Sequence, residues 1–366
     1  MILDFILCIV GLAVLVYSAD KLVEAASNLA LNLGVSKMVV GLTIVAAGTS
    51  LPEFFVSLTS SIQGNPSLSL GNVVGSNIMN IALILGVTAL VLPINSKKEM
   101  VKREVPIMIA VTALAWIFAK TDSVFSPVEG AILLIVFVIY NTVSYVIGKN
   151  EAKLAKEYAE EADRFVSYVE DKEDDQVKKE DNQEKAESNE GKAEADEKSK
   201  EESDNKQLPS VKVNILWLIA GLIGLGIGSK LLVDSATKIA AALGVSSEVI
   251  GLTIVAIGTS LPELVTSIVA AKKGQSDLSI GNVLGSNIFN LTAIIGTAAT
   301  VPWLVPNATG TKYLVVSPEM LSLNIPIMMV VAVILLPIMI TDMKISRKEG
   351  AFFLAIYICL RLCLYK

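Results

Sequence analysis

Residues 41–53 read GLTIVAAGTSLPE, and residues 251–263 read GLTIVAIGTSLPE, which is identical at twelve of thirteen positions. A second pair of stretches begins thirty residues after each copy, GNVVGSNIMN at 71–80 and GNVLGSNIFN at 281–290. Both pairs are 210 residues apart, so the two motifs repeat together. Each first motif ends at a glutamate, Glu53 or Glu263, inside a run that is otherwise too apolar to hold a charge without a purpose. The duplicated carboxylate predicts a paired ion site within a membrane.

The composition is that of a membrane protein with one polar segment. Of the 366 residues 53% are hydrophobic, and the mean hydropathy is +0.61, whereas soluble domains are about 45–50% apolar. Residues 149–212 hold 13 Lys/Arg against 21 Asp/Glu, a net charge of −8, and the remainder carries +2. The acidic balance therefore describes one segment and indicates no nucleic-acid partner. Histidine, the usual proton shuttle and transition-metal ligand, is absent from the sequence.

The apolar runs predict ten membrane spans in two halves. Thr121-Asp122 matches Thr341-Asp342 at an offset of 220, because ten residues are inserted before residue 320, so the repeat covers both halves. Each half holds five spans, and because five is odd the second half enters the membrane from the opposite side. We therefore expect an all-α integral membrane protein with ten transmembrane helices as two inverted five-helix repeats. Each span needs about 20 residues, and we place them at 2–33, 38–63, 69–92, 100–119, 126–148, 213–243, 248–272, 277–303, 320–341 and 347–365.

Charges in the short loops predict the orientation, because Lys and Arg favour the cytoplasmic side. With the N-terminus outside, the inside loops contain ten Lys/Arg and the outside loops with the C-terminal end contain four. We expect both termini to be extracytoplasmic, in the plasma membrane of the cell. The ten are Lys37, Lys97, Lys98, Lys102, Arg103, Lys272, Lys273, Lys344, Arg347 and Lys348.

The chain is expected to have three parts. Residues 1–148 form the first membrane repeat, 149–212 an acidic cytoplasmic loop, and 213–366 the second membrane repeat. The loop begins with apolar residues at helical spacing from Leu154 to Val169, which predicts a helical extension of the fifth span. From about residue 170 to 208 it is too polar to pack a core, so we expect a disordered, solvated linker. A calcium sensor is the alternative, but EDKEDD at 170–175 lacks the alternating ligands and central glycine of an EF-hand.

Residues around each glutamate supply oxygen atoms for a cation. Pro52 lacks an N–H and clashes with the carbonyl four residues back, so the helix must break or kink beside Glu53 and free backbone oxygens. Thr49 and Ser50 add hydroxyls, and Thr259, Ser260 and Glu263 repeat the arrangement. The alternative is an intramembrane salt bridge with Lys21, Lys230 or Lys238, but these lysines do not repeat in register.

The second motif places polar side chains on one helical face. Ser76 and Asn80 are four residues apart, as are Ser286 and Asn290, and a repeated polar face near mid-span favours ion coordination. Glycines in the same motif are typical of close helix packing, which is their alternative role. They are Gly71, Gly75, Gly281 and Gly285.

Both motifs, present twice and in order, resemble the α-repeats of the cation/Ca²⁺ exchanger superfamily, and the prokaryotic sodium/calcium exchangers are most similar. The resemblance implies ten helices in two inverted repeats and a site on the second and seventh. It marks Glu53 and Glu263 as the calcium carboxylates. It marks the hydroxyls of Thr49, Thr259, Ser50, Ser260, Ser76 and Ser286 as further ligands, with the backbone oxygens of Ala46 and Ala256.

One position departs from part of the family, which has Asp where this chain has Asn290. With Asn80 and Asn290 both neutral, the site holds two formal charges, which one Ca²⁺ neutralises. The resemblance implies a secondary antiporter that exchanges Ca²⁺ for Na⁺ by alternating access and normally extrudes Ca²⁺. It implies no enzyme and no cofactor, the transported ions and the bilayer as partners, and a monomer. A K⁺-dependent or H⁺-coupled exchanger, or a cation channel, stays open as an alternative.

Overall fold

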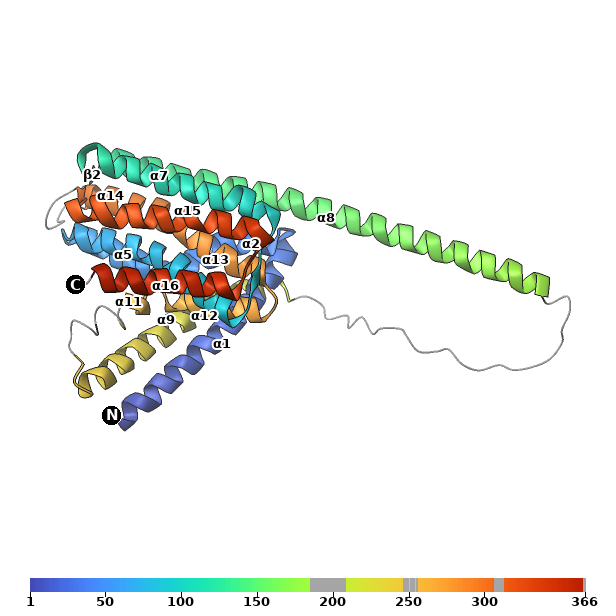
Figure 1. Cartoon of the computed structure of the whole chain (residues 1–366), viewed down its shortest axis with the longest axis horizontal. Coiled ribbons are helices and arrows are strands. Elements are labelled where there is room, and N and C mark those ends of the chain that lie inside the picture. The colour runs from blue at the N-terminus through green and yellow to red at the C-terminus, as the bar shows by residue number, and fades with distance from the viewer. Residues whose placement is uncertain (185–208, 246–249, 251–253, 255, 306–312, 365–366) are drawn as a thin grey trace.

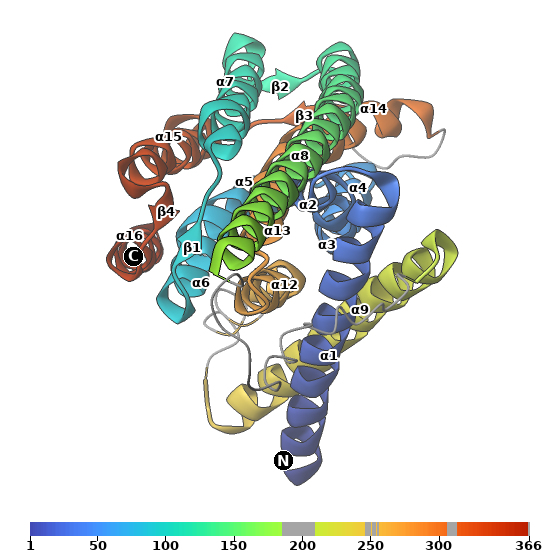
Figure 2. The ribbon, with the colours of Figure 1, turned by 90° about the vertical axis from the view of Figure 1, so that its right-hand side faces the viewer.

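The computed structural model describes residues 1–184, 209–245, 250, 254, 256–305 and 313–364, and these are almost entirely helical (Figures 1 and 2). The first half contains α1 (Ile2–Leu33), α2 (Lys37–Val40), η1 (Gly41–Val45), α3 (Ala46–Thr49), α4 (Leu51–Ile62), α5 (Pro66–Met79), η2 (Asn80–Leu85), α6 (Gly86–Val91), β1 (Ile94–Asn95), η3 (Met100–Glu104), α7 (Val105–Asp122), β2 (Val124–Phe125) and α8 (Pro127–Glu184). The second contains α9 (Val211–Ala242), α11 (Ala256–Gly258), α12 (Leu261–Lys272), α13 (Ser276–Phe289), η5 (Asn290–Ile294), α14 (Ile295–Leu304), β3 (Leu314–Val315), η6 (Met320–Asn324), α15 (Ile325–Asp342), β4 (Lys344–Ile345) and α16 (Arg347–Leu364). The segments labelled η are π-helical turns that continue the neighbouring α-helices.

Seven of the described helices are long and apolar enough to cross a membrane, or eight if the bent pair Lys37–Thr49 and Leu51–Ile62 is one span. The other two predicted spans differ for separate reasons. The predicted span 248–272 begins in residues that lie mostly outside the described part of the chain. The predicted span 347–365 forms the helix α16, but Arg347, Lys348, Glu349 and Arg361 make it too charged to meet the same criterion. The chain is therefore a helical membrane protein, and the count of ten stays a prediction.

Two spans lie at the centre of the bundle. The most apolar window of the span from Ser276 to Leu304 is 94% buried, and that of the span from Pro66 to Val91 is 78% buried. The corresponding value is 39% or less in the other five continuous spans. The central spans are the two that carry the second sequence motif, so the polar faces of α5 and α13 meet inside the protein.

The first helices of the two halves pack against each other along one side of the bundle, tilted relative to the other spans (Figure 1). Their contact is close because glycines lie between them. A Cβ on Gly228 of α9 would be 2.8 Å from the backbone nitrogen of Leu15, and one on Gly11 of α1 would be 2.8 Å from that of Leu232. The pair α1 and α9 thus forms a peripheral unit whose backbones touch.

Two short antiparallel ladders connect the halves. β1 pairs with β4, with Ile94 opposite Ile345, and β2 pairs with β3, with Phe125 opposite Leu314. The offset of 220 makes β1 equivalent to β3 and β2 equivalent to β4. Each strand therefore pairs with the equivalent of the other strand in its own half.

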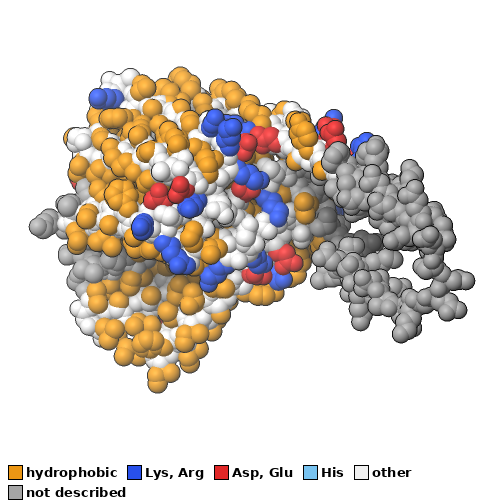
Figure 3. Space-filling view, turned by 45° about the vertical axis from the view of Figure 1, so that its right-hand side comes forward, with side chains coloured by type: hydrophobic (Ala, Val, Ile, Leu, Met, Phe, Trp, Pro, Cys, Tyr) orange, Lys and Arg blue, Asp and Glu red, His pale blue; other side chains and the backbone are white. Residues whose placement is uncertain are grey.

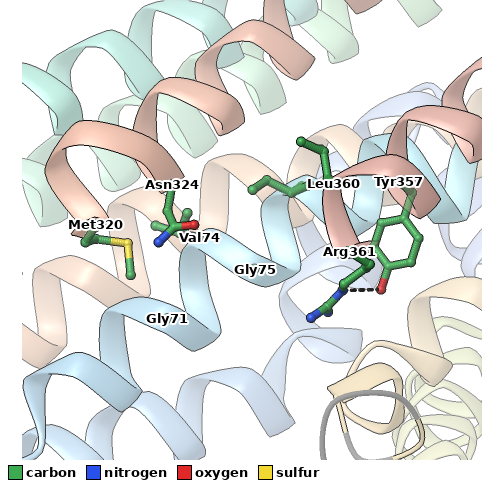
Figure 4. A pocket seen from close by; sticks show the side chains of 9 residues that line it. Gly71, Val74, Gly75, Met320, Asn324, Tyr357, Leu360 and Arg361 are labelled. Carbon is green, nitrogen blue, oxygen red and sulfur yellow. Dashed lines mark hydrogen bonds between the residues drawn. The ribbon is translucent and has the colours of Figure 1, made fainter. Parts of the chain in front are cut away.

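The motif glycines of α13 and α5 differ in their surroundings. A Cβ on Gly281 would lie 2.9 Å from the Met38 carbonyl oxygen, and one on Gly285 would overlap the Leu42 carbonyl oxygen, so both permit close packing on α2 and η1. Gly71 and Gly75 have no described atom within 4 Å of such a Cβ. They line a pocket of about 140 Å³ beside Asn324 and Arg361 (Figure 4). Among the described residues, close approach is thus present at the second pair and not at the first. The counterpart of α2 and η1, residues 247–255, lies mostly outside the described residues.

Helix α8 continues far beyond the bundle and ends at Glu184 (Figure 1). The predicted helical extension is therefore present, and it runs past residue 170, where we expected the linker to begin. Ion pairs four residues apart, such as Lys153 with Glu157 at 3.7 Å and Lys156 with Glu160 at 3.8 Å, support a helix that needs no core. The rest of the predicted linker, residues 185–208, lies outside the described residues.

The paired glycines give a test of this packing. Gly285→Ala should lower the free energy of unfolding by about 1–3 kcal/mol, because the added methyl group meets backbone that cannot move aside. Gly75→Ala is the matched control and should be neutral or stabilising by up to about 1 kcal/mol, since it adds a helix former where no described atom meets the new methyl group. Thermal unfolding in detergent measures both. Equal losses in the two variants would contradict the packing difference.

Candidate functional site

The candidate site begins at two breaks in the membrane helices. The span from Lys37 to Ile62 bends by 49° between Thr49 and Leu51. At the break Ser50 leaves helical geometry, with φ −85° and ψ 9°, and Ser260 does the same in the second copy, with φ −94° and ψ 7°. Each break lies two residues before the proline, which then occupies the first turn of the next helix, where its missing N–H costs nothing. The predicted break is thus present in both copies.

The two glutamates begin the helices that follow the breaks. Glu53 lies in the first turn of α4 and Glu263 in the first turn of α12, and each is 1% exposed. Ser50 Oγ donates a hydrogen bond to Glu263 Oε1 at 2.9 Å, and Ser260 Oγ donates to Glu53 Oε1 at 3.0 Å. Each half therefore supplies the hydroxyl that holds the carboxylate of the other half.

Asn80 and Asn290 form a second symmetric pair, at the points where α5 and α13 change to the π-helical turns η2 and η5. Asn80 Nδ2 donates to Asn287 Oδ1 and Asn290 Nδ2 donates to Asn77 Oδ1, both at 2.9 Å. π-Helical turns inside α-helices are frequent at functional sites. Both amide groups are thus fixed by contacts between the two central helices.

Four buried oxygens of the two motifs have no hydrogen-bond partner among the described residues: Glu53 Oε2, Glu263 Oε2, Asn80 Oδ1 and Asn290 Oδ1. Buried polar atoms are normally partnered. A hydrogen bond to a charged group contributes about 1.5–3 kcal/mol, which at most matches the cost of about 2.5–3.5 kcal/mol for one charge at the bilayer centre. One serine per glutamate leaves the second oxygen uncompensated. The four oxygens are ligands of the kind that hard cations prefer.

Basic side chains do not compensate these carboxylates in the described part of the chain. Lys21 pairs with Glu24 at 3.0 Å and Lys230 pairs with Asp234 at 3.2 Å, so the salt-bridge alternative fails for both lysines. A third buried carboxylate shows the contrast. Glu104 accepts from Arg103 Nε at 2.7 Å and from the Tyr140 hydroxyl at 2.9 Å, so both of its oxygens are partnered. Burial alone therefore does not define the site.

The remaining predicted residues lie around the breaks. Thr49 Oγ1 donates to Asn282 Oδ1 at 3.1 Å and to the Ala46 carbonyl at 3.3 Å, and Ser286 Oγ donates to the same carbonyl at 3.4 Å. Protein hydroxyls thus occupy the Ala46 oxygen in this structure. Three further residues have simple placements: Ser76 is buried on α5, Thr259 lies in the turn before α12, and Ala256 begins α11.

Asn72 and Asn282 are site residues that the sequence analysis did not single out. Asn72 Nδ2 donates to the Glu53 carbonyl at 3.0 Å, and Asn282 Nδ2 donates to the Glu263 carbonyl at 3.4 Å. They hold the backbone of each glutamate against the neighbouring central helix. The Gly-Asn dipeptide that opens each second motif was the available signal, since it repeats at the same offset.

Comparison with known proteins shows what the whole chain resembles. A model of the sodium/calcium exchanger protein family matches residues 3–146 and 213–366. The sodium/calcium exchanger MaX1 of Methanosarcina acetivorans is 36% identical over 364 residues, 99% of this chain and 98% of that protein. The inner membrane protein YrbG of Escherichia coli is 34% identical over 301 residues, 82% of this chain and 81% of that protein. Among solved structures, that of the sodium-calcium exchanger NCX_Mj aligns with a TM-score of 0.73 at 30% identity and covers 100% of both chains.

The exchanged serines give a test of the site. Ser50→Ala and Ser260→Ala each remove the donor that holds one carboxylate oxygen, and we expect each to weaken Ca²⁺ binding about tenfold, the equivalent of about 1.4 kcal/mol. The rise of the thermal midpoint with Ca²⁺ concentration measures the affinity. Thr59→Ala is the control, because the Thr59 hydroxyl bonds only to carbonyls of its own helix. Wild-type affinity in both serine variants would contradict the arrangement.

Proposed function

The chain belongs to the sodium/calcium exchanger protein family, and we propose that it is a secondary antiporter that extrudes Ca²⁺ from the cell against entering Na⁺. The observation that carries this proposal is the set of four unpartnered oxygens beside the two facing helix breaks. Transport of this kind needs no enzyme chemistry and no cofactor, because the ion gradients supply the free energy.

We propose that Glu53 and Glu263 are the shared ligands of both ions. One Ca²⁺ neutralises the two carboxylates, whereas Na⁺ must bind in greater number to do so, which makes occupancy by the two ions mutually exclusive. The amide oxygens of Asn80 and Asn290 are further, neutral ligands beside the two carboxylates. The other proposed ligands are the hydroxyls of Thr49, Thr259, Ser50, Ser260, Ser76 and Ser286 and the backbone oxygens of Ala46 and Ala256.

The proposed mechanism is alternating access in ten helices arranged as two inverted repeats, residues 1–148 and 213–366. Support comes from the exchanged serine bonds and from the two ladders, since in each case one contact becomes the other when the two halves are interchanged. The peripheral helices α1 and α9 are placed to slide and change access. Leu222 of α9 lies against Gly48, and the Ser229 hydroxyl bonds to the Gly258 carbonyl at 2.6 Å, beside both breaks.

The proposed location is the plasma membrane, with both termini outside and residues 149–212 in the cytoplasm. Figure 3 supports this orientation, because most charged side chains on that face gather towards the end from which α8 projects, and hydrophobic side chains cover the remainder. Seven of the ten inside Lys/Arg are exposed: Lys97, Lys98, Lys102, Lys272, Lys273, Arg347 and Lys348. We further propose that a single chain transports, since both halves of the site are present in it.

Flux in proteoliposomes tests the exchange. Vesicles loaded with Na⁺ should take up radiolabelled Ca²⁺ from Na⁺-free medium, and uptake should stop when Na⁺ is equal on both sides. Parallel vesicles with imposed K⁺ or pH gradients measure participation of K⁺ or H⁺. Ca²⁺ uptake that does not depend on internal Na⁺ would contradict antiport and indicate a channel.

Removing either carboxylate charge should abolish exchange. In Glu53→Gln or Glu263→Gln the site keeps its shape but loses half of the charge that attracts Ca²⁺, so we expect Na⁺-dependent Ca²⁺ uptake below detection, with a monodisperse protein. Asp342→Asn is the control, because Asp342 is exposed and pairs only weakly, with Lys344 at 3.6 Å. Near-wild-type uptake in either glutamine variant would overturn the assignment.

A further inference from the structure

Two asparagines that bear no proposed ligand atom connect the central helices. Asn77 of α5 and Asn287 of α13 are equivalent at the offset of 210, and they are 1% and 2% exposed. Asn77 Nδ2 donates to the Asn287 backbone carbonyl, and Asn287 Nδ2 donates to the Asn77 backbone carbonyl, both at 3.3 Å. Asn287 Nδ2 also lies 3.5 Å from Met108 Sδ. The donor end of each amide is thus directed at the opposite helix.

This contact decides which end of each amide is free. A backbone carbonyl can only accept a hydrogen bond, so it holds the NH₂ end of Asn77 or Asn287. The Oδ1 end of each is left as an acceptor, and it receives the Nδ2 of Asn290 or Asn80 at 2.9 Å. Two chains of hydrogen bonds result, which we call relays. One runs from the Asn287 carbonyl through Asn77 to Asn290, and the other runs from the Asn77 carbonyl through Asn287 to Asn80.

The relays end at the site. With its NH₂ end held by Asn287, Asn80 is left with an Oδ1 that has no partner among the described residues, and Asn290, held by Asn77, is left in the same state. If either amide turned over, it would present an NH₂ group with its partial positive charge to the cation. An asparagine in a buried cation site is useful only in one of its two orientations.

We propose that Asn77 and Asn287 are positioning residues that fix the amides of Asn290 and Asn80 with their oxygens towards the transported cation. The inference rests on the proposed function, because it deepens the assignment of the same site. Each relay crosses between α5 and α13, so each half of the protein orients the amide ligand of the other half.

A double-mutant cycle tests the relay. Asn287→Leu should raise the KM for Ca²⁺ about tenfold at little changed maximal flux, since it releases one ligand and leaves both carboxylates. In Asn80→Asp both ends of the side chain are oxygens, so orientation no longer matters. Adding Asn287→Leu to Asn80→Asp should therefore change the KM less than about twofold. Asn77→Leu with Asn290→Asp forms the symmetric cycle, and Asn141→Ala is the control because Asn141 bonds within its own helix.

The outcomes separate the two proposals. If wild-type vesicles show no Na⁺-dependent Ca²⁺ uptake, the proposed function fails. If they do, and Asn287→Leu changes the KM equally in the wild type and in the Asn80→Asp variant, the amides of Asn77 and Asn287 are structural and the positioning proposal is overturned. Asn287→Ala adds no volume and replaces Asn287→Leu if that variant aggregates in size-exclusion chromatography. Failure of the leucine and alanine variants to fold in both cycles would equally reject positioning in favour of a structural role.

Discussion

The burial of two carboxylates with no basic partner among the described residues is the constraint on which the rest of this structure depends. Glu53 and Glu263 are each 1% exposed, and the Oε1 atom of each accepts a serine hydroxyl of the other half. A buried ion pair would have neutralised them and closed the site, as Arg103 does for Glu104. The protein instead supplies neutral donors and leaves one oxygen on each carboxylate available. A bound cation can neutralise these carboxylates, and it can leave again because no basic side chain of the described residues takes its place.

The surrounding structure follows from presenting oxygens in an apolar bundle. Helix breaks at Ser50 and Ser260 release the hydroxyls that hold the carboxylates, and the prolines that follow keep the breaks in place. Close packing of α13 on η1 requires glycine at residue 285, where a side chain would meet the Leu42 carbonyl. In the proposed site, amides rather than further carboxylates are the additional ligands, so its formal charge stays at −2.

Exchange between equivalent residues is the common feature of these contacts. Ser50 donates to Glu263 and Ser260 donates to Glu53. Asn77 accepts from Asn290, and Asn287 accepts from Asn80. Neither half can therefore form its share of the site alone. The arrangement also makes the site sensitive to relative movement of the halves, because every exchanged bond lengthens when they separate.

The amino-acid sequence by itself determined the membrane class, the family, the pair of glutamates and the helix break beside each one. These follow from local properties: apolar length, a charge that such a run tolerates only for a purpose, and the missing N–H of proline. It did not show that the break falls at Ser50, that α8 continues to Glu184, or that Asn72, Asn77, Asn282 and Asn287 take part. Which serine meets which glutamate, and which end of an amide faces the site, was decided only by the tertiary structure. Those choices depend on how two helices 210 residues apart in the sequence cross each other. A hydrogen bond is directional and spans about 3 Å, and the spacing of residues along the chain does not specify distances and angles between two helices.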